Sequence, residues 1–269
     1  MTIFEAVTFG VIQGLAEFLP ISSSGHLAIT HWLLGSANPE TDVPFDVALH
    51  IGTLIPVVLY FWKDWLDLIK GFFSNVTNGQ MFKNPDSKLL CQLAIATIPG
   101  ALFGLLLEKQ AKTIFRSPVS IACMMIIMGA VLWIADRKAK QGKKVKEISW
   151  LDTIWVGLSQ AFAIIPGVSR SGVTMTTGLF CKFDRETAAR FSFLLSAPII
   201  LGAAVHELHH LIKHGIETDI LVGMISAALV GFIAIAGLLR YVQKRSFLPF
   251  VIYRFLFGIA VIVLFFFRG

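Results

Sequence analysis

The chain has 269 residues, of which 55% are hydrophobic and 15% charged, and its mean hydropathy is +0.74. This composition excludes an ordinary soluble domain and fits a single integral membrane domain that spans the whole chain. The net charge of +6 is typical of cytoplasmic loops of a membrane protein, so nucleic-acid binding is not predicted. The three cysteines have no CxxC spacing, so neither a disulfide framework nor a zinc site is predicted.

Six apolar stretches are long enough to cross a hydrocarbon core of about 30 Å. They lie near residues 45–62, 88–107, 117–136, 188–206, 220–239 and 249–267. Two further apolar segments, 5–35 and 151–180, are each interrupted by polar residues. We expect each of them to form a re-entrant helix pair, because broken helices are tolerated in a membrane only where protein or a watery cavity surrounds them. The alternative is a set of ordinary spans joined by polar loops.

The interruption is a polar phrase that occurs twice, first from Gly10 to His26 and again from Gly157 to Gly172. At an offset of 147 residues, Gly10, Gln13, Ser22, Ser24 and Gly25 align with Gly157, Gln160, Ser169, Ser171 and Gly172. Polar side chains at membrane depth usually mark a functional site. A duplicated helix break predicts that this site lies at the interface of two internal repeats.

The distribution of charge predicts the topology. If both broken segments re-enter and the N-terminus is outside, most of the 23 Lys and Arg residues fall on one side, as cytoplasmic loops require. Each half then holds one re-entrant helix pair and three transmembrane helices, an odd number that inverts the second half. We therefore predict an all-α polytopic membrane protein with two inverted-topology repeats, about 1–136 and 150–269. A basic cytoplasmic linker at 137–149 joins them, and both termini are outside.

The two phrases carry chemistry that suits a phosphate. Gln13 and Glu17 are four residues apart and share one face of a helix, which Pro20 helps to end. In the second phrase, Arg170 lies at the start of a helix, where free N–H groups and a guanidinium favour an anion. Glu17 would repel a phosphate unless a proton or a divalent cation intervened. A carboxylate, a pyrophosphate and Mg²⁺ or Ca²⁺ together would remove this conflict.

The phrases resemble the signature motifs of the bacterial undecaprenyl pyrophosphate phosphatase family of the bacitracin-resistance type. The similar stretches are Gln13-x-x-x-Glu17, Pro20-x-Ser-Ser-Ser-Gly-His26, Pro166-Gly-x-Ser-Arg-Ser-Gly-x-Thr174, Phe191–Pro198 and Pro249–Arg254. Some members carry Glu where this chain has Gln13. The resemblance implies a plasma-membrane hydrolase that removes the terminal phosphate of undecaprenyl pyrophosphate. Such an enzyme recycles the lipid carrier for peptidoglycan synthesis, confers bacitracin resistance, uses Mg²⁺ or Ca²⁺, and opens its active site to the outer face.

The resemblance also implies roles for particular residues. The catalytic set is Glu17, Ser23, His26 and Arg170. The substrate-binding set is Ser22, Ser24, Ser169, Ser171, Gly172 and Thr174, and the metal ligands are Gln13 and Glu17. Ser23 is the favoured nucleophile, with Glu17 or His26 to activate it. Attack by His26, or by a water molecule that one of these residues orients, is the alternative.

Two other functions remain open from the residues alone. Inverted repeats with broken helices are also typical of secondary transporters, so a carrier or flippase for a lipid phosphate or another anion is the main alternative. A nucleophile beside an acid–base pair and an arginine has no use in a carrier, which favours the enzyme. A binding module for pyrophosphate-bearing antibiotics is disfavoured, because the chain has no large exposed domain. The expected partners are a polyprenyl pyrophosphate and membrane lipid, and a homodimer is left open.

Three weaker features complete the sequence-based picture. Asp46 and His50 are four residues apart and either line the site or form an interfacial pair. Arg254 is interpreted as either a structural residue or a residue at the cytoplasmic interface. Four histidines are interpreted as part of a solvated outward loop; they are His206, His209, His210 and His214.

Overall fold

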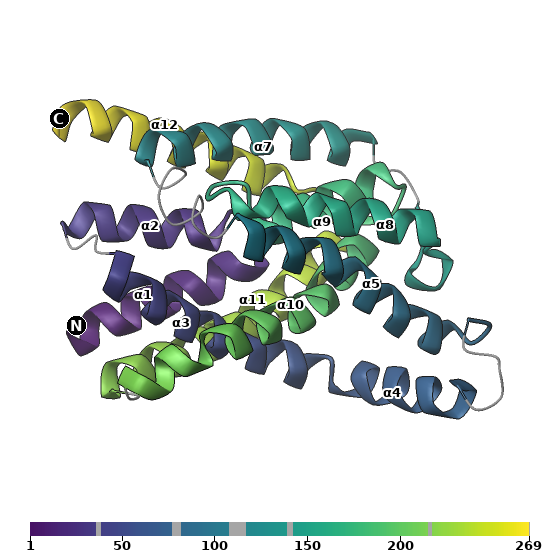
Figure 1. Cartoon of the computed structure of the whole chain (residues 1–269). Coiled ribbons are helices and arrows are strands. Elements are labelled where there is room, and N and C mark those ends of the chain that lie inside the picture. The colour runs from purple at the N-terminus through teal and green to yellow at the C-terminus, as the bar shows by residue number, and fades with distance from the viewer. Residues whose placement is uncertain (36–38, 77–81, 108–116, 139–141, 215–216, 269) are drawn as a thin grey trace.

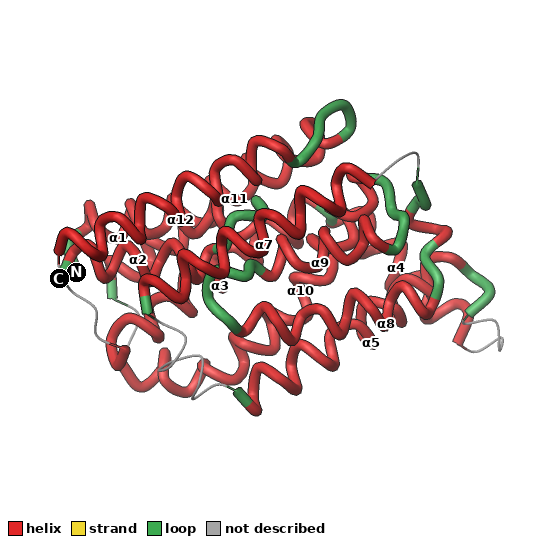
Figure 2. Tube along the Cα trace, turned by 90° about the horizontal axis from the view of Figure 1, so that it is seen from above, coloured by secondary structure: helices red, strands yellow, loops and turns green. Residues whose placement is uncertain are grey.

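The computed structural model describes residues 1–35, 39–76, 82–107, 117–138, 142–214 and 217–268, without the side chains of 39–44 and 206–214. Every regular element in these ranges is a helix (Figures 1 and 2). The first half holds α1 (Ile3–Phe18), α2 (Ser23–Leu34), α3 (Pro39–Tyr60), α4 (Trp62–Val76), α5 (Pro85–Leu106) and α7 (Pro118–Lys138). The second half holds η2 (Val145–Glu147), α8 (Trp150–Ser159), η3 (Gln160–Ile164), α9 (Arg170–Phe180), α10 (Arg185–His214), α11 (Thr218–Val242) and α12 (Leu248–Arg268).

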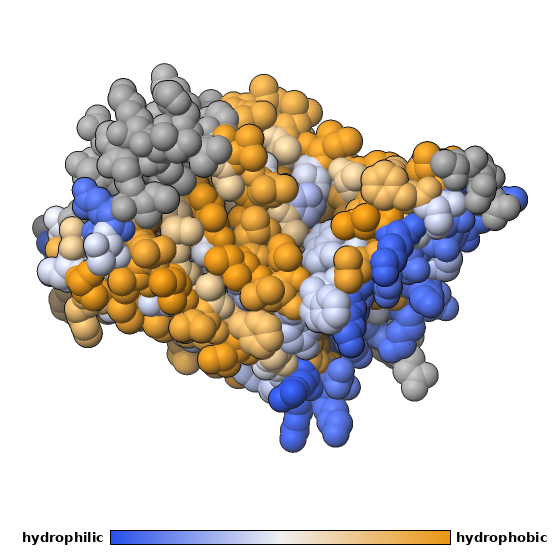
Figure 3. Space-filling view, turned by 90° about the horizontal axis from the view of Figure 1, so that it is seen from below, coloured by the Kyte–Doolittle hydropathy of each residue, from blue (hydrophilic) through white to orange (hydrophobic). Residues whose placement is uncertain are grey.

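The predicted polytopic membrane protein is confirmed. Five helices in the described chain are long and apolar enough to cross a membrane: α5, α7, α10 over Arg185–Val205, α11 and α12. The bent pair of α3 and α4 adds a sixth if it is counted as one span. Hydrophobic side chains cover most of the face seen in Figure 3, and hydrophilic side chains gather toward the right of that view.

Helix α4 was not predicted. The sequence placed the end of a span near residue 62, and the chain instead bends by 75° there and continues as a further helix. Lys63, Asp64, Asp67 and Lys70 alternate with apolar residues along α4, which makes it amphipathic. Such a segment lacks the uniform hydropathy by which a membrane-spanning helix is found in a sequence.

Both broken segments fold as the sequence predicts, each into two helical pieces. The first break separates α1 from α2, and the second separates α8 and η3 from α9. Helices α1 and α2 lie at the end of the molecule that holds both termini, and α8 extends toward the opposite end (Figure 1). The two breaks meet in the middle of the molecule, where Gly167 of the second donates its backbone N–H to Ser22 of the first at 3.1 Å.

Glycines allow the first piece of each broken segment to approach a long helix closely. A Cβ atom at Gly10 would lie 2.4 Å from the carbonyl oxygen of Gly223, so α1 contacts the backbone of α11 directly. A Cβ atom at Gly157 would lie 2.9 Å from the Cα atom of Ala96, so α8 contacts α5 in the same way. Gly10 and Gly157 are aligned positions of the two phrases, which means that the duplication extends to helix packing.

The end of the molecule opposite the termini is held together by ion pairs. Arg185 binds Asp136 at 2.5 Å, and Arg190 binds Asp64. The basic segment between the halves is part of this network, because Lys144 binds Asp184 at 2.5 Å. The hydrogen bond and charge of Asp184 raise the pKa of Lys144 above its ordinary value.

Candidate active site

Helices α2 and α9 begin in the same way. Ser22 precedes α2 and Ser169 precedes α9, and each has a φ of 76°, a left-handed conformation that is uncommon outside glycine. The Ser22 side chain accepts a hydrogen bond from the Gly25 N–H at 3.3 Å, and the Ser169 side chain accepts one from the Gly172 N–H at 3.0 Å. These caps turn the chain sharply, so that both helices start inside the protein.

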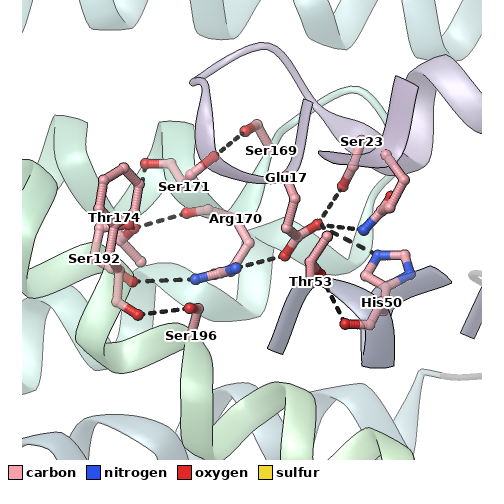
Figure 4. Close-up of polar contacts among 12 residues, drawn as sticks. Glu17, Ser23, His50, Thr53, Ser169, Arg170, Ser171, Thr174, Ser192 and Ser196 are labelled. Atoms are coloured by element: carbon pink, nitrogen blue, oxygen red, sulfur yellow. Dashed lines mark hydrogen bonds and ion pairs between the residues drawn. The ribbon is translucent and has the colours of Figure 1, made fainter. Parts of the chain in front are cut away.

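The residue after each cap points at the same carboxylate. Ser23 and Arg170 are the first residues of α2 and α9. The Ser23 hydroxyl donates to Glu17 Oε2 at 2.7 Å, and Arg170 Nη2 donates to Glu17 Oε1 at 2.5 Å (Figure 4). Glu17, in the last turn of α1, therefore joins the two breaks through its two oxygen atoms.

Two further side chains contact Glu17 Oε2. Gln13 lies one turn earlier on α1 and donates its Nε2 hydrogen at 3.1 Å, and His50 Nε2 of α3 lies 3.4 Å away. His50 Nδ1 is 2.7 Å from the carbonyl oxygen of Asp46, which can only accept, so Nδ1 carries a proton. Glu17 is only 6% exposed, and the hydrogen bonds that Ser23, Arg170 and Gln13 donate compensate the cost of burying its charge.

The guanidinium of Arg170 is oriented from α10. Arg170 Nη1 donates to the Ser192 carbonyl oxygen at 3.1 Å, and the Ser192 hydroxyl lies 2.7 Å from Thr174 Oγ1 (Figure 4). Two of the five N–H groups of Arg170 thus have partners in the described chain, and the others remain available to a ligand.

A cavity of about 270 Å³ opens over this centre. The polar side chains in its lining are Glu17, Ser23, Ser24, His50, Ser169 and Arg170, and the remaining lining is apolar and comes largely from α10. The N-termini of α2 and α9 both contribute to the wall. A concave site with an arginine and two helix N-termini favours an anionic oxygen-rich group, and the Ser23–Glu17 pair sets a hydroxyl beside a base.

The sequence-predicted residues divide into two groups. Glu17, Ser23, Ser24, Ser169 and Arg170 line the cavity. The others do not line it; they are Gln13, Ser22, His26, Ser171, Gly172 and Thr174. Of these, the Ser171 hydroxyl bonds across the gap to the Leu19 carbonyl oxygen at 3.1 Å. Gln13 is fully buried, and no described residue is a hydrogen-bond partner of its Oε1.

His26 occupies a different place from the rest of the predicted catalytic set. Its Nδ1 donates to the Ser22 carbonyl oxygen at 2.7 Å, and its Nε2 is 2.6 Å from the Tyr253 hydroxyl. Its ring stacks on Phe257 with a centroid distance of 4.3 Å. His26 is not among the residues that line the cavity, and both of its nitrogens have protein partners.

Arg254 of α12 is the largest fully buried side chain in the described chain, which fits the structural interpretation of this residue and not a place at the cytoplasmic interface. It is fully buried and donates to carbonyl oxygens of both breaks, namely Pro20 at 3.0 Å, Gly167 at 2.7 Å and Val168 at 3.2 Å, and also to Met125 at 2.9 Å. The carbonyls of Pro20, Gly167 and Val168 lie outside the helices, so no helical N–H reaches them, whereas Met125 lies within α7. Arg254 holds the two breaks against each other.

The sequence offered Asp46 and His50 as possible lining residues, and only His50 lines the cavity and contacts Glu17. The Asp46 carboxylate lies 3.3 Å from His31 Nε2. Ser192 falls within the stretch that resembled the family, but nothing in the sequence linked it to Arg170. The side chains of the four histidines from His206 to His214 lie outside the described residues.

These features define a polytopic α-helical membrane protein whose buried centre combines a serine, a carboxylate and an arginine. The chain belongs to the family described as bacitracin resistance protein BacA, whose profile matches residues 6–260.

Curated relatives match over nearly the whole chain. The undecaprenyl-diphosphatase of Pelotomaculum thermopropionicum is 50% identical over 264 residues, which cover 98% of this chain and 97% of the relative. The undecaprenyl-diphosphatase of Moorella thermoacetica is 48% identical over 268 residues, with both chains fully covered. That of Desulforudis audaxviator is 45% identical over 269 residues, again with full coverage of both.

The position of Arg254 leads to a test of stability. Arg254→Met leaves the carbonyls of both breaks unpaired, and each buried orphan costs about 1–3 kcal/mol. We expect the midpoint of thermal unfolding in detergent to fall well below that of the wild type. Arg240→Met, which replaces an exposed arginine on α11, is the matched control. Equal midpoints for the two variants would contradict the role of Arg254.

Proposed function

We propose that this chain is an undecaprenyl-diphosphatase, a hydrolase that converts undecaprenyl pyrophosphate to undecaprenyl phosphate and inorganic phosphate. The observation that carries the proposal is the buried Glu17, which binds the Ser23 hydroxyl and the Arg170 guanidinium at the same time. The relatives named undecaprenyl-diphosphatase supply the substrate class. Regeneration of the lipid carrier supports cell-wall synthesis, and the family's name connects it with bacitracin resistance.

The geometry supports Ser23 as the nucleophile. The Ser23 Oγ attacks the terminal phosphorus, its proton passes to Glu17, and the bridging oxygen leaves with undecaprenyl phosphate. Water then hydrolyses the phosphoserine, which releases inorganic phosphate and restores the serine hydroxyl. A hydroxyl 2.7 Å from a carboxylate is within reach for this proton transfer. The free N–H groups of Arg170 and the helix N-termini stabilise the charge on the transferring phosphoryl group.

His26 fits a supporting role better than a nucleophilic one. Its two nitrogens bond to Ser22 and Tyr253, and its ring packs against α12. A histidine in this position fixes the start of α2, and thereby the direction in which Ser23 points. His50, which faces Glu17 from α3, is better placed to assist in proton transfer.

A divalent cation fits the centre only if the substrate helps to bind it. The described residues include no group of three or more His, Cys, Asp or Glu side chains that could hold a metal. Glu17 and the unpartnered Oε1 of Gln13 are the oxygen atoms that would bind it. Mg²⁺ is commonly held by one or two carboxylates together with substrate phosphates. When bound, such an ion would neutralise charge on the leaving lipid phosphate.

A further prediction concerns turnover. Arg170→Ala removes the cation that faces the phosphoryl group, and we expect phosphate release from undecaprenyl pyrophosphate to fall by roughly 10³-fold or more. The assay uses purified protein in detergent. The Arg240→Met protein serves as the control for loss of a surface arginine, and it should retain wild-type activity.

Two outcomes of this assay would count against the proposal. Arg170→Ala activity within a few fold of the wild type would remove Arg170 from the centre. No phosphate release by folded wild-type protein would favour a carrier of lipid phosphate instead. The same assay with EDTA tests the cation, since full activity without divalent ions would exclude it.

Another prediction concerns the identity of the nucleophile. With terminally radiolabelled substrate and rapid acid quenching, we expect phosphate to be trapped on Ser23 in the wild type. Ser23→Ala should trap none and lose nearly all turnover, whereas His26→Gln should still form the phosphoserine. Trapping on His26, or undiminished turnover by Ser23→Ala, would overturn the assignment.

We also propose that the two halves are inverted repeats with both termini outside the plasma membrane and the cavity open to the outer face. Three observations support this topology: the two breaks share their capping geometry, both termini lie at one end of the molecule, and hydrophilic side chains gather at the opposite end (Figures 1 and 3). Val47 and Ile51 of α3 line the cavity. Both residues come well before the bend between α3 and α4, so the cavity lies away from the end of the molecule that α4 reaches (Figure 1).

Cysteine accessibility tests this topology. In a background without the native cysteines, Thr2→Cys should react with an impermeant maleimide in intact cells. Gln243→Cys, an exposed position at the basic end, should react only after the cells are permeabilised. The reverse pattern would invert the proposed orientation.

A further inference from the structure

A second cavity lies beside the first, between α5 and α10. Its volume is about 490 Å³, and it is formed by one face of each helix, with Gly100 and Gly104 on α5 and Gly202 and Ala203 on α10. Among its described lining residues, Thr97 alone has a polar side chain. The Thr97 hydroxyl donates to the Leu93 carbonyl oxygen at 2.7 Å and is thereby satisfied.

The two cavities share part of their walls. Ile199 and Ala203 line both the cavity over Glu17 and the groove between α5 and α10. These residues are four apart on α10 and therefore lie on one face of the helix, next to each other. The groove thus continues from the polar centre instead of forming a separate surface feature.

Two of the three glycines in the groove keep it open without serving helix packing. A Cβ atom at Gly104 or at Gly202 would meet no described atom within 4 Å. By contrast, Gly10 and Gly157 lie against the backbone of a neighbouring helix. Glycine within a helix costs about 1 kcal/mol relative to alanine, so its use here is consistent with a need for space.

The groove lies at membrane depth. Both α5 and α10 are candidate spans, and exposed apolar side chains flank the groove on each helix, including Ile98 and Leu102 on α5 and Leu201 on α10. An apolar groove in the hydrocarbon region binds an apolar chain. A chain attached to a phosphate in the neighbouring cavity would reach it at a high effective concentration.

We propose that the groove between α5 and α10 binds the polyprenyl tail of the substrate while its pyrophosphate lies over Glu17, Ser23 and Arg170. This inference rests on the proposed function, because the headgroup must occupy the first cavity. A cavity of about 270 Å³ accommodates a headgroup but not a long polyprenyl chain, so the tail has to leave it. The shared wall at Ile199 and Ala203 is the exit. Specificity for long tails then comes from the α5–α10 groove.

Blocking the groove away from the polar cavity tests the proposal. Gly104 lines only the groove, so Gly104→Leu should fill it and leave the Glu17 centre intact. We expect kcat/KM for undecaprenyl pyrophosphate to fall roughly tenfold or more, as expected for lost apolar contacts in a pocket. The kcat/KM for geranyl pyrophosphate, whose short tail makes fewer contacts in the groove, should change much less.

Gly237→Leu is the matched control. Gly237 is on α11, also has open space around its Cβ position, and lines neither cavity. This variant should behave as the wild type on both substrates. If Gly104→Leu leaves kcat/KM for the long substrate unchanged, the proposal that the groove binds the tail is overturned. An equal loss of kcat/KM on both substrates would overturn it too.

Photolabelling separates failure of the groove from failure of the proposed function. A prenyl pyrophosphate with a diazirine in its tail needs to bind but not to react. Cross-links confined to residues 97–105 and 198–205 would support the groove even if the wild type released no phosphate. Cross-links confined to other helices would overturn it even if the phosphatase assay succeeded.

Discussion

This structure depends on finding hydrogen-bond partners for the backbone N–H and C=O groups at its two buried helix breaks. Where a helix ends inside the protein, its last carbonyls and the first N–H groups of the next helix have no bulk water to bind. The chain meets this need with Arg254, which donates to carbonyls from both breaks, and with Ser22 and Ser171, which bond from one break to the other. The positions of Ser23 and Arg170 follow from these contacts, because each is the first residue of a helix that the contacts fix in place.

The duplicated breaks bring different residues to one point. Ser22 and Ser169 have the same backbone angle and the same capping bond, so the positions that follow them are equivalent. One of those positions holds Ser23 and the other holds Arg170. Glu17 has no counterpart in the second phrase, where Ile164 occupies the aligned position. A nearly symmetric scaffold thus supports an asymmetric centre, with a hydroxyl and a guanidinium on opposite sides of one carboxylate.

Glycines determine how much space surrounds the centre. Gly10 and Gly157 allow helices to contact each other closely, whereas Gly104 and Gly202 leave a groove unfilled. Glycine in a membrane helix therefore has two opposite uses in this chain, and only the neighbouring atoms distinguish them. The polar cavity and the apolar groove are joined by Ile199 and Ala203, so one face of α10 borders both environments.

Several features could be predicted from the sequence because they depend on local composition. Long apolar runs specify the membrane helices, and the repeated phrases specify two breaks. The resemblance of these phrases to the family's motifs pointed to Glu17, Ser23 and Arg170, which the structure brings together. The amphipathic helix α4 could not be found in this way. Three contacts of the site join residues far apart in the sequence. They are the contact of His26 with Tyr253, that of His50 with Glu17, and the hydrogen bonds from Arg254 to four carbonyls. Such contacts depend on how the helices cross, and only the tertiary structure determined them, because a sequence pattern gives the face of a helix but not the partner that it meets.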